Sequence, residues 1–175
     1  MLTFTTFARH EPGIVFSLLS QSYAAYLACD PLAAEAWPAG WQAYDRDVFR
    51  LPDTVGACGF VTCLGDRAIG LASWDPRGFP EVAIIGHNCI LPAFQGNGYG
   101  KIQIRRVLAI LQERGFKRAR VTTGEHTFFA PAQRMYQACG FREIRRGGGD
   151  PHSTFRTIDY ERVLLSADSE RRLVG

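Results

Sequence analysis

Apolar residues recur along this chain at two spacings, and each spacing predicts one type of element. Residues 2–8 alternate between apolar and polar side chains, which predicts a first strand. Residues 11–28 carry apolar side chains three and four positions apart, which predicts a helix. Residues 33–49 predict a second helix, which we expect to bend at Pro38 because proline lacks a backbone N–H.

Strand patterns dominate the middle of the chain. Strands are predicted at residues 56–64 and 68–74, and the short turn Gly65-Asp66-Arg67 between them predicts a hairpin. Residues 82–91 form a long, nearly continuous apolar run after a loop at 76–80. Such a run is typical of a strand at the centre of a sheet, where both faces are covered.

Helix and strand patterns alternate in the last part of the chain. Residues 99–114 have the spacing of an amphipathic helix, which Gly115 would end. The remaining predicted elements are a strand at 118–123, a helix at 130–139, and strands at 141–146 and 155–164. We expect the glycine-rich segment 147–151 to be a mobile loop. The predicted order is therefore βααβββαβαββ, which is an α/β fold.

The size and composition of the chain are those of one globular domain. Its 175 residues, 46% of them hydrophobic and 21% charged, can bury a sizeable core. We expect residues 1–165 to form a single domain and residues 166–175 to be a C-terminal tail. Because the sequence has neither an 18-residue apolar run nor a basic, apolar leader, we expect a cytoplasmic protein without a membrane segment.

The cysteines do not form a recognisable framework. There are five of them, and neither Cys-x-x-Cys nor a zinc-finger spacing joins them. We expect reduced, buried thiols and no metal site, since each cysteine lies among apolar neighbours. These residues are Cys29, Cys58, Cys63, Cys89 and Cys139.

A glycine-dense segment follows the central strand and leads directly into a predicted helix. It reads Ile90-Leu91-Pro92-Ala93-Phe94-Gln95-Gly96-Asn97-Gly98-Tyr99-Gly100-Lys101. Three glycines in five positions leave backbone N–H groups uncovered at the positive end of a helix, where phosphate oxygens bind. The spacing fits neither a P-loop, because Ile102 follows Lys101, nor Gly-x-Gly-x-x-Gly, because the glycines strictly alternate. The remaining pattern is Gln-x-x-Gly-x-Gly.

This pattern resembles the signature of the GNAT superfamily of acyl-CoA-dependent N-acyltransferases, Arg/Gln-x-x-Gly-x-Gly/Ala after a strand. Gln95, Gly98 and Gly100 match it. Ala132-Gln133-Arg134-Met135-Tyr136-Gln137-Ala138-Cys139-Gly140-Phe141 is similar to the second family motif, Ala-x-x-Leu/Met-Tyr-x-x-x-Gly-Phe. The resemblance covers about residues 80–146, and the predicted element order agrees with it. It implies a GNAT-like mixed sheet that splays between the fourth and fifth strands.

The resemblance implies acetyl-CoA as co-substrate and assigns residues to its binding. The backbone at Asn88, Cys89 and Ile90 would pair with the pantetheine arm as an added strand. Lys101, Arg105 and Arg106 would either reach a phosphate or be solvated cations. The loop that would wrap the pyrophosphate consists of Gln95, Gly96, Asn97, Gly98, Tyr99, Gly100 and Lys101.

The resemblance also implies that an amine attacks the thioester directly, in the gap between the splayed strands. Tyr136 matches the family tyrosine that protonates the departing thiolate, although its spacing also fits a core position. We expect an oxyanion-stabilising N–H near residues 88–90. One departure from the family is Phe129, where many members carry an asparagine that contacts pantetheine. That contact must be made differently here.

The base is less clearly marked than the acid. His87 alternates with Ile85 and Cys89, so we expect it to face the gap and accept the amine proton. The alternative is that His87 only makes a hydrogen bond within the fold. Glu125 and His126 are further candidates, although both follow a predicted strand end and fit a loop as well.

Charge and aromatic residues bear on the acceptor. The net charge of +3 is too small to predict nucleic-acid binding. Residues 1–80 hold five arginines against eight carboxylates, whereas residues 81–175 hold fifteen Lys and Arg against nine. This division suits a polyanionic cofactor and a cationic amine, with chance asymmetry as the alternative. Candidate acceptor residues, all of which also fit core or surface positions, are Trp37, Trp41, Tyr44, Trp74, Phe79, Asp45, Asp47 and Asp53.

The sequence therefore favours an N-acyltransferase that moves acetyl from acetyl-CoA to a primary amine on a small molecule or a peptide. The alternative is a GNAT-like module that binds acyl-CoA without turnover. An unrelated phosphate-binding α/β protein is disfavoured by the second motif. The pattern does not identify the acceptor, and it leaves open whether the protein is a homodimer.

Overall fold

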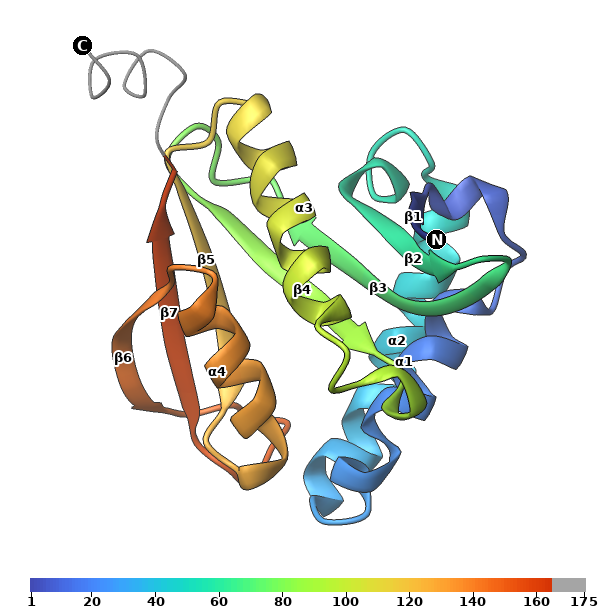
Figure 1. Cartoon of the computed structure of the whole chain (residues 1–175). Coiled ribbons are helices and arrows are strands. Elements are labelled where there is room, and N and C mark those ends of the chain that lie inside the picture. Colours follow the sequence, from blue (N-terminus) through green and yellow to red (C-terminus); the bar gives the residue numbers. More distant parts are fainter. Residues whose placement is uncertain (165–175) are drawn as a thin grey trace, which may run out of the picture.

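Helices and strands follow one another in the predicted order βααβββαβαββ. The computed structural model describes residues 1–164, so the predicted tail at 166–175 lies outside the described residues (Figure 1). The elements are β1 (Leu2–Thr5), α1 (Ile14–Leu27), α2 (Pro31–Arg50), β2 (Gly59–Leu64), β3 (Arg67–Asp75), β4 (Ala83–Ile90), α3 (Tyr99–Glu113), β5 (Arg118–Gly124), α4 (Ala130–Ala138), β6 (Arg142–Gly148) and β7 (Thr157–Val163).

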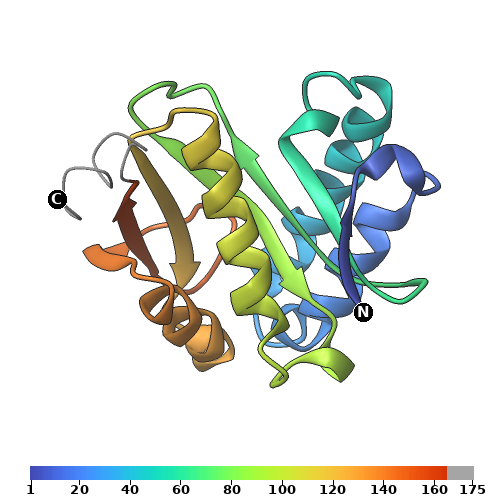
Figure 2. The same ribbon diagram turned by 45° about the horizontal axis from the view of Figure 1, so that its top comes forward.

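The strands form one mixed sheet in the order β1-β2-β3-β4-β5-β7-β6. Neighbouring strands are antiparallel except β4 and β5, which are parallel. These two strands pair only between Ala83–Ile85 and Ala119–Val121. Beyond these pairs they diverge, and Figures 1 and 2 show the wedge between them widening along both strands. The predicted splay between the fourth and fifth strands is confirmed.

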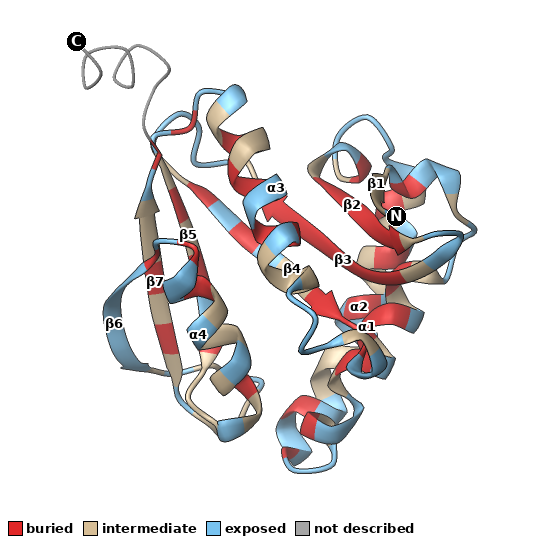
Figure 3. Cartoon of the chain, viewed as in Figure 1, coloured by how far each residue is buried: buried red, intermediate tan, exposed pale blue. Residues whose placement is uncertain are grey.

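Helices cover both faces of the sheet. Ile104 and Leu111 of α3 share one hydrophobic core with Trp74 of β3. Leu19 of α1 shares a second core with Leu71, which points to the opposite face of the same strand. Full burial of a Leu or Ile side chain stabilises the fold by roughly 1.5–3 kcal/mol. Figure 3 shows buried residues concentrated in the central strands, whereas the edge strand β6 is largely exposed.

An extra residue interrupts β4 in the middle of the sheet. Gly86 and His87 both lie opposite Ser73 of β3, which is the arrangement of a β-bulge. The His87 N–H donates to the Ser73 Oγ at 2.9 Å, so the backbone donor of the extra residue is satisfied. The bulge reverses the alternation of side chains. Ile85 before it belongs to the α3-side core, and Cys89 after it belongs to the α1-side core.

Several local predictions need correction. The segment 147–151 is not a free loop, because β6 continues to Gly148 and Asp150 accepts a hydrogen bond from the His152 N–H at 2.8 Å. Cys29 is exposed at the end of α1, so not every thiol is buried. The helix predicted at residues 33–49 is α2, which begins earlier, at Pro31, and carries Pro38 in its interior. Within residues 1–164, no helix combines the length and apolarity needed to cross a membrane.

Candidate functional site

The glycine-rich loop between β4 and α3 presents backbone donors at a helix start. Gly98 is the N-cap of α3 and has a φ of 80°, a left-handed backbone that glycine adopts without strain. Apart from its two chain neighbours, no atom of the described residues lies within 4 Å of the place where its Cβ would be, so the space in front of it is open. The first bond of the helix joins the Ile102 N–H to the Gly98 carbonyl. The preceding N–H groups therefore remain available to an anion.

This loop opens into a cavity of about 530 Å³, called here the loop cavity. Nine of the ten residues predicted to bind the co-substrate line it, the exception being Asn97. The Asn97 amide instead donates to the carbonyls of Phe94 and Gln95 within the loop. The lining cations are Lys101, which was predicted, and Arg134 of α4, which was not. The nine residues are Asn88, Cys89, Ile90, Gln95, Gly96, Gly98, Tyr99, Gly100 and Lys101.

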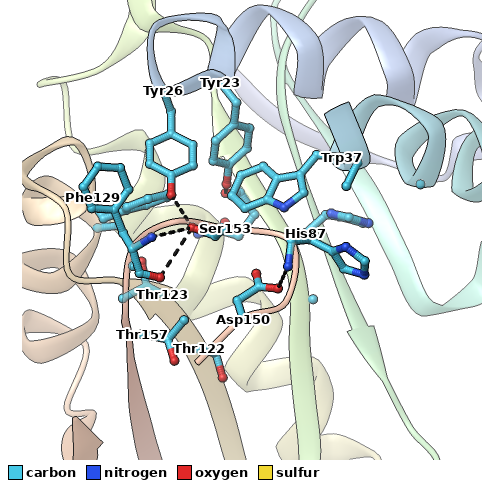
Figure 4. A pocket seen from close by; sticks show the side chains of 18 of the residues that line it. Tyr23, Tyr26, Trp37, His87, Thr122, Thr123, Phe129, Asp150, Ser153 and Thr157 are labelled. Atoms are coloured by element: carbon cyan, nitrogen blue, oxygen red, sulfur yellow. Dashed lines mark hydrogen bonds between the residues drawn. The ribbon is translucent and has the colours of Figure 1, made fainter. Parts of the chain in front are cut away.

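A second cavity, also of about 530 Å³, lies against α1 and α2 and is called here the aromatic cavity. Tyr23, Tyr26 and Trp37 form one wall, and threonines of β5 and β7 face them (Figure 4). Tyr23, Asn88, Phe129 and Ala132 line both cavities, so the two cavities meet at the splay between β4 and β5. Phe129, at the position of the departure from the family pattern, is thus part of the boundary between them.

Backbone polar groups of β4 face the gap. The Asn88 carbonyl accepts a hydrogen bond from the Tyr23 hydroxyl at 3.1 Å, and the Ile90 carbonyl accepts one from Gln95 Nε2 at 2.8 Å. The Leu91 N–H, by contrast, donates to Ile69 on the β3 side. Because the N–H and C=O of one strand residue point to the same side, the N–H groups of Asn88 and Ile90 also face the gap.

Tyr136 ends a chain of hydrogen bonds that runs through the core. Thr62 donates to Gln103 Oε1, and Gln103 Nε2 donates to Asn88 Oδ1 at 2.6 Å. Asn88 Nδ2 then donates to the Tyr136 hydroxyl at 3.0 Å. Every group in the chain donates to the next one, so the Tyr136 oxygen is an acceptor here and its own proton is left to donate into the aromatic cavity.

The protonation state of Tyr136 follows from its surroundings. The side chain is only 4% exposed, and burial raises its pKa to about 12, although the hydrogen bond from Asn88 lowers it in part. Tyr136 is therefore a protonated donor at neutral pH. Gln103 was missed by the sequence reasoning, although a polar residue four positions before Val107 on the apolar stripe of α3 was a usable signal.

His87 lines the aromatic cavity, but the regular alternation from which it was predicted is not present in β4. The bulge breaks its alternation with Ile85, and its ring packs against Tyr44 of α2 with 4.7 Å between ring centroids. Burial lowers the pKa of His87 to about 4. The imidazole is therefore neutral at physiological pH and can accept a proton or a hydrogen bond.

The other sequence candidates are occupied elsewhere. Glu125 lies 3.7 Å from Arg146 in an ion pair, and His126 Nδ1 accepts a hydrogen bond from the Phe128 N–H. Neither residue lines a cavity. Asp45 accepts hydrogen bonds from N–H groups at the start of α1, so it is structural. Of the aromatic candidates, Trp37 and Trp41 line the aromatic cavity, whereas Trp74 and Phe79 do not.

Asp30 lies buried behind the cavity lining, where it holds Tyr26 of the wall to Ser153. Its buried carboxylate accepts hydrogen bonds from the Tyr26 hydroxyl at 2.8 Å and the Ser153 hydroxyl at 2.7 Å. The Thr154 N–H and hydroxyl donate to it as well. Burial raises the pKa of Asp30, but the hydrogen bonds from Ser153, Tyr26 and Thr154 outweigh it and hold the pKa well below its usual value. No sequence pattern pointed to this contact.

Solved structures of known proteins share this fold. A candidate GNAT-family acetyltransferase from Desulfovibrio desulfuricans is 13% identical, with a TM-score of 0.73 over 94% of this chain and 100% of the other. The candidate acetyltransferase yncA from Salmonella typhimurium, determined with its cofactor acetyl-CoA, is 14% identical, with a TM-score of 0.67 over 95% of both chains. A candidate phosphinothricin N-acetyltransferase is 15% identical, with a TM-score of 0.69 over 95% of this chain and all of the other.

At these identities, the structural matches establish the fold alone. A search of curated proteins finds no match. The family model described as the Acetyltransferase (GNAT) family matches residues 25–141, a span that holds β4, the glycine-rich loop, α3 and α4. Since this match covers more than half of the sequence, the chain belongs to the GNAT acetyltransferase family.

Proposed function

We propose that this protein transfers the acetyl group of acetyl-CoA to a primary amine by direct attack. The observation that carries the proposal is the meeting of the loop cavity and the aromatic cavity at the splay, beside the Tyr136 hydroxyl. One cavity offers backbone donors and cations, and the other offers aromatic walls. A thioester in the first and an amine in the second would therefore come together at the point where they share lining residues.

Acetyl-CoA binding is supported by the chemistry of the loop cavity. The N–H groups at the start of α3 and the cations Lys101 and Arg134 suit a pyrophosphate. The gap-facing backbone at Asn88 and Ile90 suits the amides of a pantetheine arm lying along β4 as an added strand. A structural neighbour, yncA, contains acetyl-CoA, which agrees with this assignment.

The reaction needs no covalent intermediate on the protein. The amine nitrogen forms a C–N bond to the acetyl carbonyl carbon, the C–S bond breaks, and the sulfur leaves with the electron pair. The Tyr136 hydroxyl donates a proton to that sulfur, and the nitrogen loses one proton to the neutral His87 imidazole or to water. The products are an N-acetyl amine and CoA thiol. The gap-facing N–H of Asn88, which lines both cavities, would stabilise the oxyanion.

The test is the release of CoA thiol from acetyl-CoA across a panel of primary amines, with the product mass measured in parallel. We expect thiol release that depends on the amine and a product 42 Da heavier than the amine, a mass difference of about one acetyl group for one hydrogen. Mass analysis of the protein in the same samples should show no acetyl adduct. Tight acetyl-CoA binding without turnover of any amine would instead support a non-catalytic module.

A further inference from the structure

The aromatic cavity differs from the loop cavity in the chemistry it can recognise, and this difference bears on the acceptor. The Tyr23 hydroxyl donates to the Asn88 carbonyl, and the Tyr26 hydroxyl donates to Asp30. Both polar tips are thus used inside the protein. Tyr26 is only 1% exposed, so the open aromatic surface of the wall comes from the half-buried rings of Tyr23 and Trp37. Trp37 stacks on Tyr26, with ring centroids 5.1 Å apart and planes 29° from parallel. The wall is therefore suited to an aromatic or flat apolar group.

The charged residues that line this cavity disfavour an acidic acceptor. Among residues 1–164, neither lysine nor arginine lines it, and its carboxylate is the half-exposed Asp150. His87 and His152 are its other ionisable acceptors besides the tyrosines. The loop cavity, in contrast, has both Lys101 and Arg134. A carboxylate or phosphate on the acceptor would meet no counter-ion in the aromatic cavity, and an unpaired ion is costly to desolvate.

We infer that the acceptor is an arylalkylamine without an acidic group, with its ring against the wall of Tyr23 and Trp37. This inference rests on the proposed function, since it names the amine that attacks the thioester. Asp150 supplies negative charge that favours the approach of an ammonium group, and Tyr136 and His87 face the same space as the attacking nitrogen. The aromatic lining, with the carboxylate of Asp150 and neither lysine nor arginine among its described residues, thus favours a cationic or neutral amine over an amino acid.

Matched pairs of amines test the inference directly. Phenethylamine and L-phenylalanine differ only by the α-carboxylate, and so do tryptamine and L-tryptophan; butylamine lacks the ring. We expect kcat/KM, measured by thiol release from the wild-type protein, to be at least about tenfold higher for phenethylamine than for phenylalanine or butylamine. The tryptamine and tryptophan pair should differ in the same direction.

The outcomes separate the inference from the proposed function. Equal or faster turnover of the amino acids would refute the inference that the acceptor has no acidic group. Equal turnover of butylamine would refute the inference that the acceptor has an aromatic ring. In both cases, acetyl transfer itself would stand. If none of a broad amine panel is acetylated, the proposed function fails and this inference fails with it.

Variants of the wall and of the charge provide a second test. Trp37→Leu should raise KM for phenethylamine by about tenfold and change that for butylamine by less than about twofold. Phe79→Leu is its matched control, because Phe79 is an exposed aromatic residue outside both cavities. An unchanged KM for phenethylamine in a folded Trp37→Leu would refute the assigned wall.

Asp150→Asn is informative even where Trp37→Leu does not fold. Its amide oxygen can still accept the hydrogen bond from the His152 N–H. We expect KM for phenethylamine to rise by roughly threefold to fivefold, as for a partly exposed ion pair. Asp66→Asn, in the exposed turn after β2, should leave KM unchanged. A KM in Asp150→Asn equal to that in Asp66→Asn would overturn the role of this charge.

Discussion

Replacing Tyr136 with phenylalanine separates a catalytic from a structural role for its hydroxyl. The change removes one oxygen and leaves the ring, which packs 5.6 Å from Phe141 and 6.2 Å from Tyr160 between centroids. The hydrogen bond from Asn88 is lost, which costs about 1 kcal/mol of unfolding free energy. The fold should therefore survive, and any large loss of turnover must come from the missing proton donor.

The size of that loss follows from the role proposed for the hydroxyl. Burial raises the pKa of Tyr136 to about 12, so the hydroxyl keeps its proton at neutral pH and can donate it to a leaving thiolate. General acid catalysis by a positioned side chain contributes roughly 10²–10⁴-fold to a rate. We therefore expect kcat to fall by roughly 10²-fold in Tyr136→Phe.

Tyr160→Phe is the matched control for this experiment. Tyr160 is buried beside Tyr136, and its hydroxyl has no hydrogen-bond partner among the described residues. Its removal should change neither kcat nor stability measurably. Thiol release at saturating amine gives kcat for both variants, and calorimetry gives the Kd of acetyl-CoA, which should move little. A kcat of Tyr136→Phe within about threefold of that of Tyr160→Phe would refute the acid role.

Three further changes test the loop, the imidazole and the buried carboxylate. Gly98→Val should weaken CoA binding at least about tenfold by calorimetry, whereas Gly13→Val, at another left-handed helix N-cap with open space, should not. Because burial lowers the pKa of His87 to about 4, kcat should not fall as the pH drops through 6.5. A fall of kcat near pH 6.5 in the wild-type protein that is absent in His87→Gln would contradict this low pKa. Asp30→Asn should lower the unfolding free energy by about 2 kcal/mol at pH 7 in urea titrations. Since the pKa of Asp30 is lowered on folding, this difference should be present above about pH 4 and shrink as the pH falls; an equal difference at pH 3 would refute it.

The sequence predicted the parts of the site that depend on neighbouring residues. The glycine-rich loop needs only a strand, three glycines and a helix start in succession. Nine of the ten residues predicted to bind the co-substrate, in this loop and the strand before it, line one cavity. Tyr136 was placed by a motif that spans the end of one helix and the three residues after it. The order of helices and strands could be predicted for the same reason, because the spacing of apolar residues within each segment indicates its type without reference to the rest of the chain.

What the sequence did not predict depends on register and distant contacts. The bulge at Gly86 and His87 shifts every later side chain of β4 to the other face, and a continuous apolar run gives no sign of it. This is why His87 was expected on the side of Ile85. The hydrogen bond from Gln103 to Asn88 depends on how far α3 is shifted along β4, and the periodicity of apolar residues does not specify that shift.

The hydrogen bonds of Asp30 join the two halves of the splayed sheet at the end where β4 and β5 are too far apart to pair. The parallel pairing of β4 and β5 ends at Ile85, so strand hydrogen bonds hold the halves together at one end only. Asp30 follows α1, which packs on β3 and β4, whereas Ser153 and Thr154 precede β7 in the other half. A buried carboxylate with several donors restores at the open end the fixed geometry that the diverging strands lose. The width of the aromatic cavity, and with it the distance from an amine to Tyr136, therefore depends on residues more than 120 positions apart.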